Sequence, residues 1–391
     1  PKSINEFIGQ PKVREQLNLV LVDFKGGATF LGLDDLPHVS AVITNLEGEV
    51  SLVDRMQDAI NGELLRRQEL LRSAGNYASL RDYEKARLAG APLAPLPSLL
   101  IVCDEFSELL SAKPDFIDMF VQIGRVGRSL GVHLLLASQR LEEGRLRGLD
   151  THLSYRISLR TFSAMESRVV IGTPDAFELP SAPGHGYIKF GTEELTRFRA
   201  AYVSGTYRRG ESQAAIVSKD GPQVQSFDTY FVAPPAKEET PEAKADESST
   251  DDSLGESLLD ILVDQIEGKG VPAHRVWLPP LNESPTLDHL WPAIENVADR
   301  GLTVADEGVH GALAPRIGIV DKPLEQRRDT LRLDLAGGDG HIAITGGPQS
   351  GKSTAIRTIM TSLAMTHTPQ EVQFYCIDLG GGSLGGSDSE T

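Results

Sequence analysis

Eight consecutive residues have the types and spacing that are needed to hold a phosphate chain. Glycines let a backbone turn tightly, so that its N–H groups point at phosphate oxygens. Lys352 would reach the β- and γ-phosphates, and Ser353 would be a ligand of Mg²⁺. We therefore predict an ATP–Mg²⁺ site that extends to Thr354. The residues that fit the pattern G-x-x-x-x-G-K-[ST] are Gly346, Gly347, Pro348, Gln349, Ser350, Gly351, Lys352 and Ser353.

The segments on either side of this phosphate-binding loop, or P-loop, have the character that the pattern requires. The apolar run 341–345 (HIAIT) predicts a strand that enters the loop, and a helix is expected to start near Lys352. A strand, a glycine-rich loop and a helix in this order form the P-loop unit. The alternative is an ordinary glycine-rich turn between a strand and a helix, without a ligand.

A second set of candidate residues follows the apolar run 99–103, which ends in Asp104 and Glu105. This is the Walker B arrangement, in which the Asp holds Mg²⁺ through water and the Glu polarises the attacking water. The next apolar run, 132–137, is followed by Gln139, which could sense a γ-phosphate. The alternative is an ordinary strand with a solvated acidic tip.

Two segments far apart in the chain resemble each other. LNLVLVDFKGG at 17–27 parallels VQFYCIDLGGG at 372–382, which suggests two tandem copies of one domain. Lys352 precedes Asp378 by 26 residues, and a P-loop lysine at the same distance before Asp23 would lie ahead of residue 1. A Walker B aspartate as far after Asp378 as Asp104 is after Asp23 would lie beyond residue 391. We therefore expect a first copy without a P-loop and a second copy without a Walker B strand.

The elements that would position these residues alternate between apolar strands and amphipathic helices, which predicts an α/β fold with parallel sheets. Helices are expected at about 1–16, 53–72, 115–130, 257–266 and from 352 onward. Strands are expected at 17–23, 38–44, 99–103, 132–137, 154–160, within 186–203, and at 317–320, 331–335 and 341–345.

Composition and charge restrict the function. The 391 residues carry 55 acidic and 38 basic side chains, a net charge of −17, which argues against a surface built mainly to hold DNA. The stretch 234–256 has eight acidic residues and no aromatic residue, and we expect a disordered linker there. The two cysteines, Cys103 and Cys376, lie far apart in apolar runs and form no zinc pattern. We see no signal peptide and no apolar run long enough to span a membrane.

Long stretches of the chain resemble the EccC ATPases of type VII (ESX) secretion, a branch of the FtsK/SpoIIIE-like P-loop ATPases. The resemblance covers roughly residues 17–383 apart from the acidic linker. It is carried by VDFKGGATF, LPHVSAVITN, LLIVCDEFSELL, LLLASQRLEEGRLRGLDTHLSYRISLRTFSAMESRVVIG, AHRVWLPPL, GIVDKPLEQRRD, and ITGGPQSGKST through EVQFYCIDLGGG.

The resemblance implies a RecA/FtsK-like P-loop fold with two partial tandem domains. The first ATPase domain would occupy 22–233, the linker 234–256 and the N-terminal part of the second ATPase domain 257–391. Asp104 and Glu105 match the Walker B pair, and Gln139 matches the sensor position. Arg55 is the best match to an arginine that reaches a neighbouring domain's nucleotide, with Arg156 and Arg160 as weaker candidates.

The family also implies a cellular setting. Its members drive the export of small helical proteins, in hexameric motors that act with membrane-embedded secretion components. This chain would then work at the cytoplasmic face of the membrane, through an anchor that it does not itself contain. The ends depart from the family pattern: 1–21 resembles the opening of the RuvB helicase, and 382–391 is rich in Gly and Ser. Two alternatives stay open, namely an FtsK-like or RuvB-like DNA motor and a non-catalytic interaction fragment.

Overall fold

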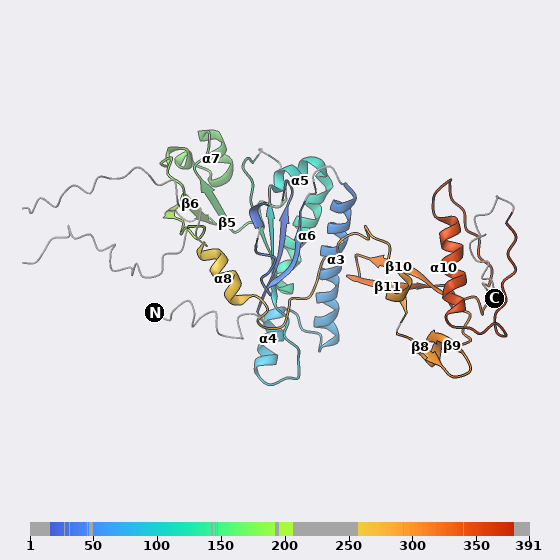
Figure 1. Cartoon of the computed structure of the whole chain (residues 1–391). Coiled ribbons are helices and arrows are strands. Elements are labelled where there is room, and N and C mark those ends of the chain that lie inside the picture. Colours follow the sequence, from blue (N-terminus) through green and yellow to red (C-terminus); the bar gives the residue numbers. More distant parts are fainter. Residues whose placement is uncertain are drawn as a thin grey trace, which may run out of the picture. The chain divides into compact units, whose positions relative to one another are not determined.

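The structure is a computed structural model of the 391-residue chain (Figure 1). Its described residues form two compact units, the first within Pro1–Glu47 and Tyr77–His274 and the second within Gly48–Asn76 and Arg275–Thr391. The structure describes residues 16–26, 28–30, 32–44, 46, 50–141, 144, 146, 148–191, 195–205, 257–291, 293–338 and 340–378.

The first unit contains a four-stranded parallel sheet with the order β2-β1-β3-β4. Its strands are nearly continuous apolar runs, as expected of a parallel sheet that is covered on its faces. All four were predicted from these runs, and the structure confirms them within one or two residues. They are β1 (Leu17–Asp23), β2 (Val39–Ile43), β3 (Ser98–Asp104) and β4 (Val132–Leu136).

Helices pack against this sheet and set its core. Alternate residues of β3 are buried, and α6 (Ile117–Leu130) packs on β4. The helix ends at Gly131, whose left-handed backbone (φ 68°) lets the chain turn directly into β4. The predicted helix at 115–130 is therefore confirmed. The shorter helices beside it are η1 (Ala28–Phe30), α4 (Leu80–Leu88), α5 (Phe106–Ala112) and η2 (Pro114–Phe116).

A smaller antiparallel sheet, β5-β6-β7, completes the first unit. A capping box at Ser163 and Glu166 starts the helix that precedes β6. Ile171, Ala176 and Leu179 form a small core that Tyr187 of β6 covers. The elements are β5 (Tyr155–Leu159), α7 (Ala164–Ile171), η3 (Asp175–Glu178), β6 (His185–Phe190), β7 (Thr196–Arg199) and, after the undescribed stretch, α8 (Leu258–Ile266).

The second unit packs α3 (Val50–Ser73) against the turn of the hairpin β10 (Arg316–Lys322) and β11 (Arg327–Arg332). The contact is close at Gly62, where a Cβ would lie 1.9 Å from the carbonyl oxygen of Leu324. Gly62 therefore allows the turn to approach the helix backbone. Buried Gln326 completes the contact by donating to the carbonyl of Ala59 and to Glu63.

The rest of the second unit surrounds α10 (Lys352–Ala364), the helix that follows the P-loop. Leu290, Trp291 and Val304 form a small core in this part of the unit, and Met365, the residue after α10, packs against it. The guanidinium of Arg316 lies 4.4 Å from the centre of the Trp291 ring. The remaining elements are α9 (Leu287–Leu290), the hairpin of β8 (Ile294–Val297) and β9 (Gly301–Val304), and η5 (Glu307–Val309).

Two predicted strands differ from the structure. The segment 341–345 pairs with no strand in the described part of the chain, so the predicted strand before the P-loop is wrong. A strand needs a neighbour to hydrogen-bond with, and Ile342 and Ile344 lie exposed instead. The strand predicted at 331–335 lies at 327–332, because the turn after Lys322 ends at Gln326 and starts the return strand earlier.

The two compact units do not follow the predicted domain boundaries. Helix α3 groups with the second unit because it contacts residues 278–279 and 321–326 there. The plan of one ATPase copy at 22–233 and another at 257–391 stays a prediction. The expected helix within 1–16, the linker at 234–256 and the segment 382–391 lie outside the described residues.

Candidate nucleotide site

The P-loop is a tight turn that leads directly into α10. Gly351 has a left-handed backbone with φ +91° and is the residue from which the helix starts. Gln349 is also left-handed, with φ 58°. These turns bring Gly346 so close to Ser350 that a Cβ on Gly346 would lie 2.3 Å from the Ser350 hydroxyl. A side chain at 346 would therefore need the Ser350 hydroxyl to move, and glycine is favoured at 351 for its conformation.

The ammonium group of Lys352 points back over this loop. It donates to the carbonyls of Gly346, at 2.6 Å, and Gly347, at 2.7 Å. The first turn of α10 contains Ser353 and Thr354 and leaves its backbone N–H groups without helical acceptors. Together with the positive end of the helix dipole, these donors make an anion site. The sequence-predicted residues 346–354 are therefore brought together on one loop and one helix start.

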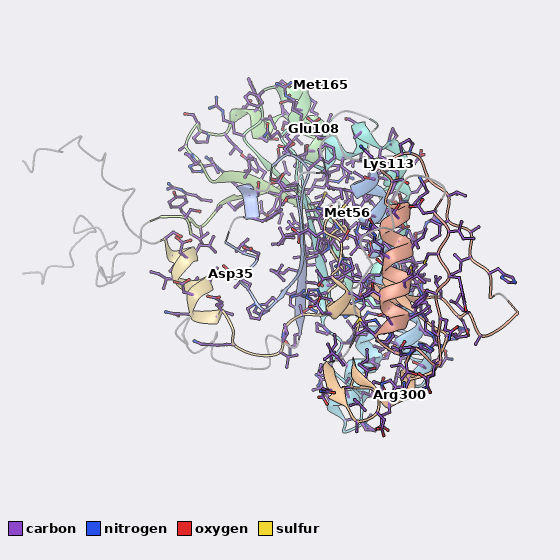
Figure 2. All side chains as sticks on the ribbon, turned by 45° about the vertical axis from the view of Figure 1, so that its right-hand side comes forward. Asp35, Met56, Glu108, Lys113, Met165 and Arg300 are labelled. Atoms are coloured by element: carbon purple, nitrogen blue, oxygen red, sulfur yellow. The ribbon has the colours of Figure 1, made fainter. Side chains whose placement is uncertain are left out.

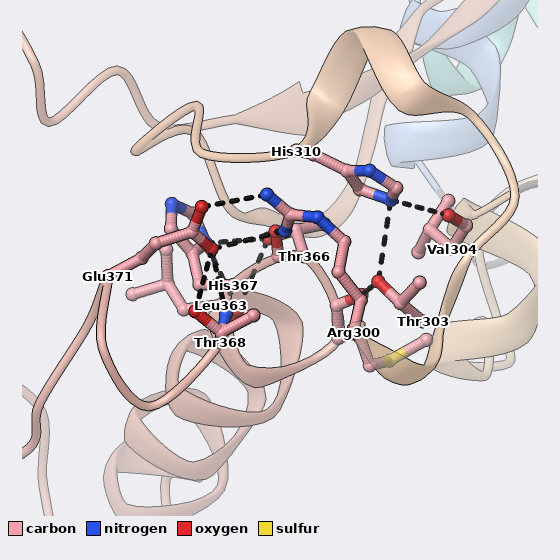
Figure 3. A network of polar contacts seen from close by, with 10 residues as sticks. Arg300, Thr303, Val304, His310, Leu363, Thr366, His367, Thr368 and Glu371 are labelled. Carbon is pink, nitrogen blue, oxygen red and sulfur yellow. Dashed lines mark hydrogen bonds and ion pairs between the residues drawn. The ribbon is translucent and has the colours of Figure 1, made fainter. Parts of the chain in front are cut away.

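The opposite end of α10 is fixed by a polar network (Figure 3). Arg300, at the turn of the β8–β9 hairpin, makes two bonds to Glu371, at 2.7 and 3.1 Å. Thr303 donates to the carbonyl of Met365 at 2.7 Å, and Thr303 also contacts His310. A cation beside the C-terminal carbonyls of a helix complements the helix dipole. The helix that starts at the P-loop is thus anchored at its far end.

Glu371 is the centre of this anchor. Hydrogen bonds from Thr368 and Arg300 lower the pKa of the Glu371 carboxyl to about 2. The carboxylate also stabilises the turn that follows α10, because it accepts a hydrogen bond from the backbone N–H of Thr368 at 2.8 Å. Sequence reasoning missed the anchor, since Arg300 and Glu371 lie 71 residues apart and share no local pattern.

In the first unit, two acidic side chains meet at the carboxyl end of the sheet. Asp23 of β1 and Asp104 of β3 occupy directly paired positions. The Thr29 hydroxyl donates to Asp104 at 2.8 Å. Burial raises the pKa of the Asp23 carboxyl, but hydrogen bonds from the N–H groups of Gly26, Lys25 and Thr29 outweigh burial and hold the pKa below its usual value. Asp23 and Asp104 are thus joined through Thr29, which is hydrogen-bonded to both carboxylates.

The predicted Walker B pair lies where the sequence placed it. Asp104 is the last residue of β3, and Glu105 is the buried residue that starts α5, with a left-handed φ of 55°. The Asp104 carboxylate accepts from the Glu105 N–H at 3.0 Å. Two side chains labelled in Figure 2 belong to α5 or follow it. Glu108 lies in α5 and forms an ion pair with Lys25 at 3.3 Å, and Lys113 is the residue after the end of α5.

Gln139 lies exposed beyond the end of β4, on the neighbouring loop. The preceding residue, Ser138, is hydrogen-bonded through its hydroxyl to Ser107 of α5. This contact joins the loop after β4 to the helix after β3. The structure therefore brings Asp104, Glu105 and the loop of Gln139 to one end of one sheet in the first unit, whereas residues 346–354 belong to the second unit.

Arg55 belongs to the second unit and is engaged there. Its guanidinium donates to the carbonyls of Leu278 and Pro279, forms an ion pair with Asp321, and lies 5.4 Å from the centre of the Trp277 ring. These partners account for its donors without a nucleotide. Its predicted role toward a neighbouring nucleotide stays a prediction. Arg156, a weaker candidate, donates to the carbonyl of Asp150.

The described residues offer little alternative chemistry. Within them, no three His, Cys, Asp or Glu side chains are grouped to hold a metal ion. Burial raises the pKa of the Cys103 thiol to about 12, so that it stays protonated and unreactive. Among the helices that the structure describes, none combines the length and apolar character that a membrane crossing requires.

Comparison with known proteins places this geometry in a family. The chain matches the FtsK/SpoIIIE family over residues 12–143 and 312–388. It is 61% identical over 377 residues to the ESX secretion system protein EccC of Thermomonospora curvata, and 53% identical over 371 residues to the ESX-4 secretion system protein EccC4 of Mycobacterium tuberculosis. Each match covers 95% of this chain and 28% of the relative.

A solved structure agrees with these matches. The cytoplasmic domain of the Thermomonospora curvata type VII secretion ATPase EccC superimposes with a TM-score of 0.80 and 59% sequence identity, over 95% of this chain and 38% of that chain. The parallel sheet with flanking helices is thus the fold of a P-loop ATPase, and this family implies the binding of a nucleotide with a divalent metal ion. The chain belongs to the FtsK/SpoIIIE family, and its high-identity relatives are EccC proteins of ESX secretion systems.

Proposed function

We propose that this chain is a component of an ATP-driven protein-export motor of type VII secretion, and that it binds ATP–Mg²⁺ at residues 346–354. The observation that carries the proposal is the P-loop geometry, in which Lys352 and the N-terminus of α10 converge on one short loop. Support for the export role comes from the relatives, whose names assign them to ESX secretion.

The roles of the loop residues follow from their positions. A triphosphate would draw the Lys352 ammonium from the carbonyls of Gly346 and Gly347, because a phosphate oxygen carries more negative charge than a carbonyl. The N–H groups of the loop and of the first turn of α10 would hold the remaining phosphate oxygens. Ser353 would be the protein ligand of Mg²⁺, and the metal would neutralise charge between the phosphates.

The residues at the end of the first unit's sheet are proposed to act in hydrolysis. Asp104 would hold Mg²⁺ through water, Glu105 would polarise the attacking water, and Gln139 would sense the γ-phosphate. Arg55 would serve a neighbouring nucleotide only after leaving its contacts with Asp321 and the carbonyl of Leu278. We therefore expect hydrolysis to demand more than the binding of nucleotide to 346–354.

The setting is part of the same proposal. The partners would be other ATPase subunits or domains of a hexameric motor, membrane-embedded secretion components and small helical secreted proteins. The chain would work at the cytoplasmic face of the membrane. Because the chain spans 28% of the length of the EccC relatives that it matches, the activity of a whole EccC protein extends to this chain only as a proposal.

Titration of a fluorescent ATP analogue with Mg²⁺ into the purified chain tests the proposed site. We expect saturable binding by the wild type and a loss of at least tenfold in affinity in Lys352→Ala, since a charge-assisted contact to phosphate contributes about 1.5–3 kcal/mol. Lys269→Ala, which removes the same charge from an exposed position outside the P-loop, is the matched control. Equal binding by all three chains would contradict the assignment.

DNA translocation is the competing function, and the same purified chain can test it. The net charge of −17 opposes contact with a phosphate backbone. We expect no shift of duplex DNA in a gel at low salt. A shift that weakens steeply as salt rises would favour a DNA motor over an export motor.

A further inference from the structure

The loop that follows β1 reaches the predicted Walker B aspartate of the neighbouring strand. Thr29 lies in η1, at the end of this loop, and its hydroxyl donates to Oδ2 of Asp104 at 2.8 Å. The two residues are 75 positions apart in the chain. They meet because β1 and β3 are adjacent and parallel, with Asp23 and Asp104 in directly paired positions. The loop after one strand can therefore act on the residue at the tip of the other.

Both oxygens of the Asp104 carboxylate are held by donors. Oδ1 accepts from the N–H of Glu105 at 3.0 Å, and Oδ2 accepts from the Thr29 hydroxyl. The terminal torsion of an Asp side chain is intrinsically broad, so two bonds to different oxygens restrict a rotation that would otherwise be free. Each carboxylate oxygen has two lone pairs and can accept a further bond. The Asp104 carboxylate is thus oriented by the protein and keeps lone pairs for a ligand.

Thr29 is in turn held by Asp23, which is 4% exposed. The Asp23 carboxylate accepts from the N–H groups of Lys25 at 2.9 Å, Gly26 at 3.2 Å and Thr29 at 3.5 Å. The Thr29 hydroxyl also lies within hydrogen-bond reach of Asp23. A hydroxyl has one proton to donate. Because three N–H groups already serve Asp23, Asp104 is the carboxylate that gains more from this proton.

We propose that Thr29 is a positioning residue, whose hydroxyl fixes the Asp104 carboxylate in the orientation that accepts from the waters of Mg²⁺. The inference rests on the proposed function, in which Asp104 holds the metal ion through water. A carboxylate that is already oriented loses little rotational freedom when it accepts these bonds, so the binding step has a smaller entropic cost. Asp23 acts one step further away, because it holds the loop that presents Thr29.

Removal of the hydroxyl at constant side-chain shape tests the positioning role in the full chain. Thr29→Val loses the donor, whereas Thr29→Ser keeps it. Without the donor the Asp104 carboxylate can rotate, and the N–H of Glu105 loses its acceptor for part of the time. We expect amide hydrogen–deuterium exchange in peptides that cover 104–106 to be about threefold faster in Thr29→Val and unchanged in Thr29→Ser. Thr358→Val, which removes a hydroxyl from α10, is the matched control.

The Mg²⁺ dependence of phosphate release tests the role of Thr29 toward the metal ion. At saturating ATP, we expect the Mg²⁺ concentration for half-maximal release to rise about fivefold in Thr29→Val, since a hydrogen bond to a charged group is lost, and to return to the wild-type value in Thr29→Ser. The affinity of residues 346–354 for a fluorescent ATP analogue should stay the same in all three chains. A general loss of folding would change both quantities together.

The outcomes separate this inference from the proposed function. Unchanged exchange at 104–106 in Thr29→Val would overturn the positioning role, whether or not the chain releases phosphate. Faster exchange with an unchanged Mg²⁺ dependence would also overturn it, because the bond would then stabilise the loop without serving the metal ion. A wild-type chain that binds nucleotide but releases no phosphate would contradict the proposed action of Asp104 in hydrolysis, and with it the inference.

Discussion

Glu371 shows how a single residue can support a distant loop. Its carboxylate accepts from Arg300 and from the N–H of Thr368, and both contacts are stronger with the ionised form. The lowered pKa means that the folded chain holds this group as a carboxylate at a pH where an unfolded chain would protonate it. The anchor at the end of α10 is therefore sensitive to acid.

This anchor predicts an acid-dependent loss of stability. The contribution of Glu371 is fully present above pH 4.5, its ordinary pKa, and is lost as the pH falls toward about 2. We expect the melting temperature of the wild type to drop more between pH 5 and pH 2.5 than that of Glu371→Gln, which cannot titrate there. Differential scanning fluorimetry across this range measures both. Parallel curves for the two chains would show that the pair contributes nothing.

At the scale of single residues, the local motifs were predictable and the long-range partners were not. Residues 346–354 were found because their pattern is contiguous, and Asp104 and Glu105 because they follow an apolar run. The contacts of Arg55 were not predicted, since its partners Leu278 and Asp321 lie more than 200 residues away. Chain separation of this kind leaves no local signal in a sequence.

At the scale of elements, Gln326 of the hairpin turn joins α3 through Glu63, whose carboxylate is ion-paired within the helix. Glu63 contacts Arg66 and Arg67 at 2.7 Å, and Gln326 of the turn donates to the same carboxylate. Burial raises the pKa of Glu63, but the bonds and charges of the two arginines outweigh it, so the pKa lies below its usual value. Arg67 is only 1% exposed, and its guanidinium forms an ion pair with Glu63.

Glu63→Ala is therefore expected to destabilise the chain by about 3–5 kcal/mol, because it removes the carboxylate that is ion-paired with the buried Arg67 guanidinium. Glu69→Ala is the matched control on the same helix: its ion pair with Arg72 is exposed, and we expect a change within about 0.5 kcal/mol. Urea denaturation followed by circular dichroism measures both. Similar midpoints for the two variants would contradict the structural role of Glu63.

The elements were predicted best where apolar runs are long and bounded by turns. β1 to β4 follow directly from such runs, and α3 follows from apolar side chains at helical spacing. The segment 341–345 has the same composition as a buried strand, yet it has no ladder in the described residues. The composition of a segment shows which side chains it would bury as a strand. Whether it pairs depends on a neighbouring strand, and the segment's own sequence does not show whether that neighbour is present.

At the scale of the whole molecule, two units and one family explain most of the sequence. The predicted α/β fold with parallel strands and flanking helices is confirmed, and so is the resemblance to EccC proteins. The grouping of α3 with residues 275–378 was not predicted, because helix amphipathicity shows that a face is buried but not which partner buries it. The net charge of −17 opposes contact with the phosphate backbone of DNA.

The central claim is that the backbone of residues 346–354 holds the phosphates of a nucleotide. Hydrogen–deuterium exchange of the full chain, with and without ATP–Mg²⁺, tests it most directly. We predict slower exchange in peptides that cover 346–354 and the start of α10, and no such change in Lys352→Ala. If nucleotide binds while these amides exchange at an unchanged rate, the P-loop is not the site and the account is wrong.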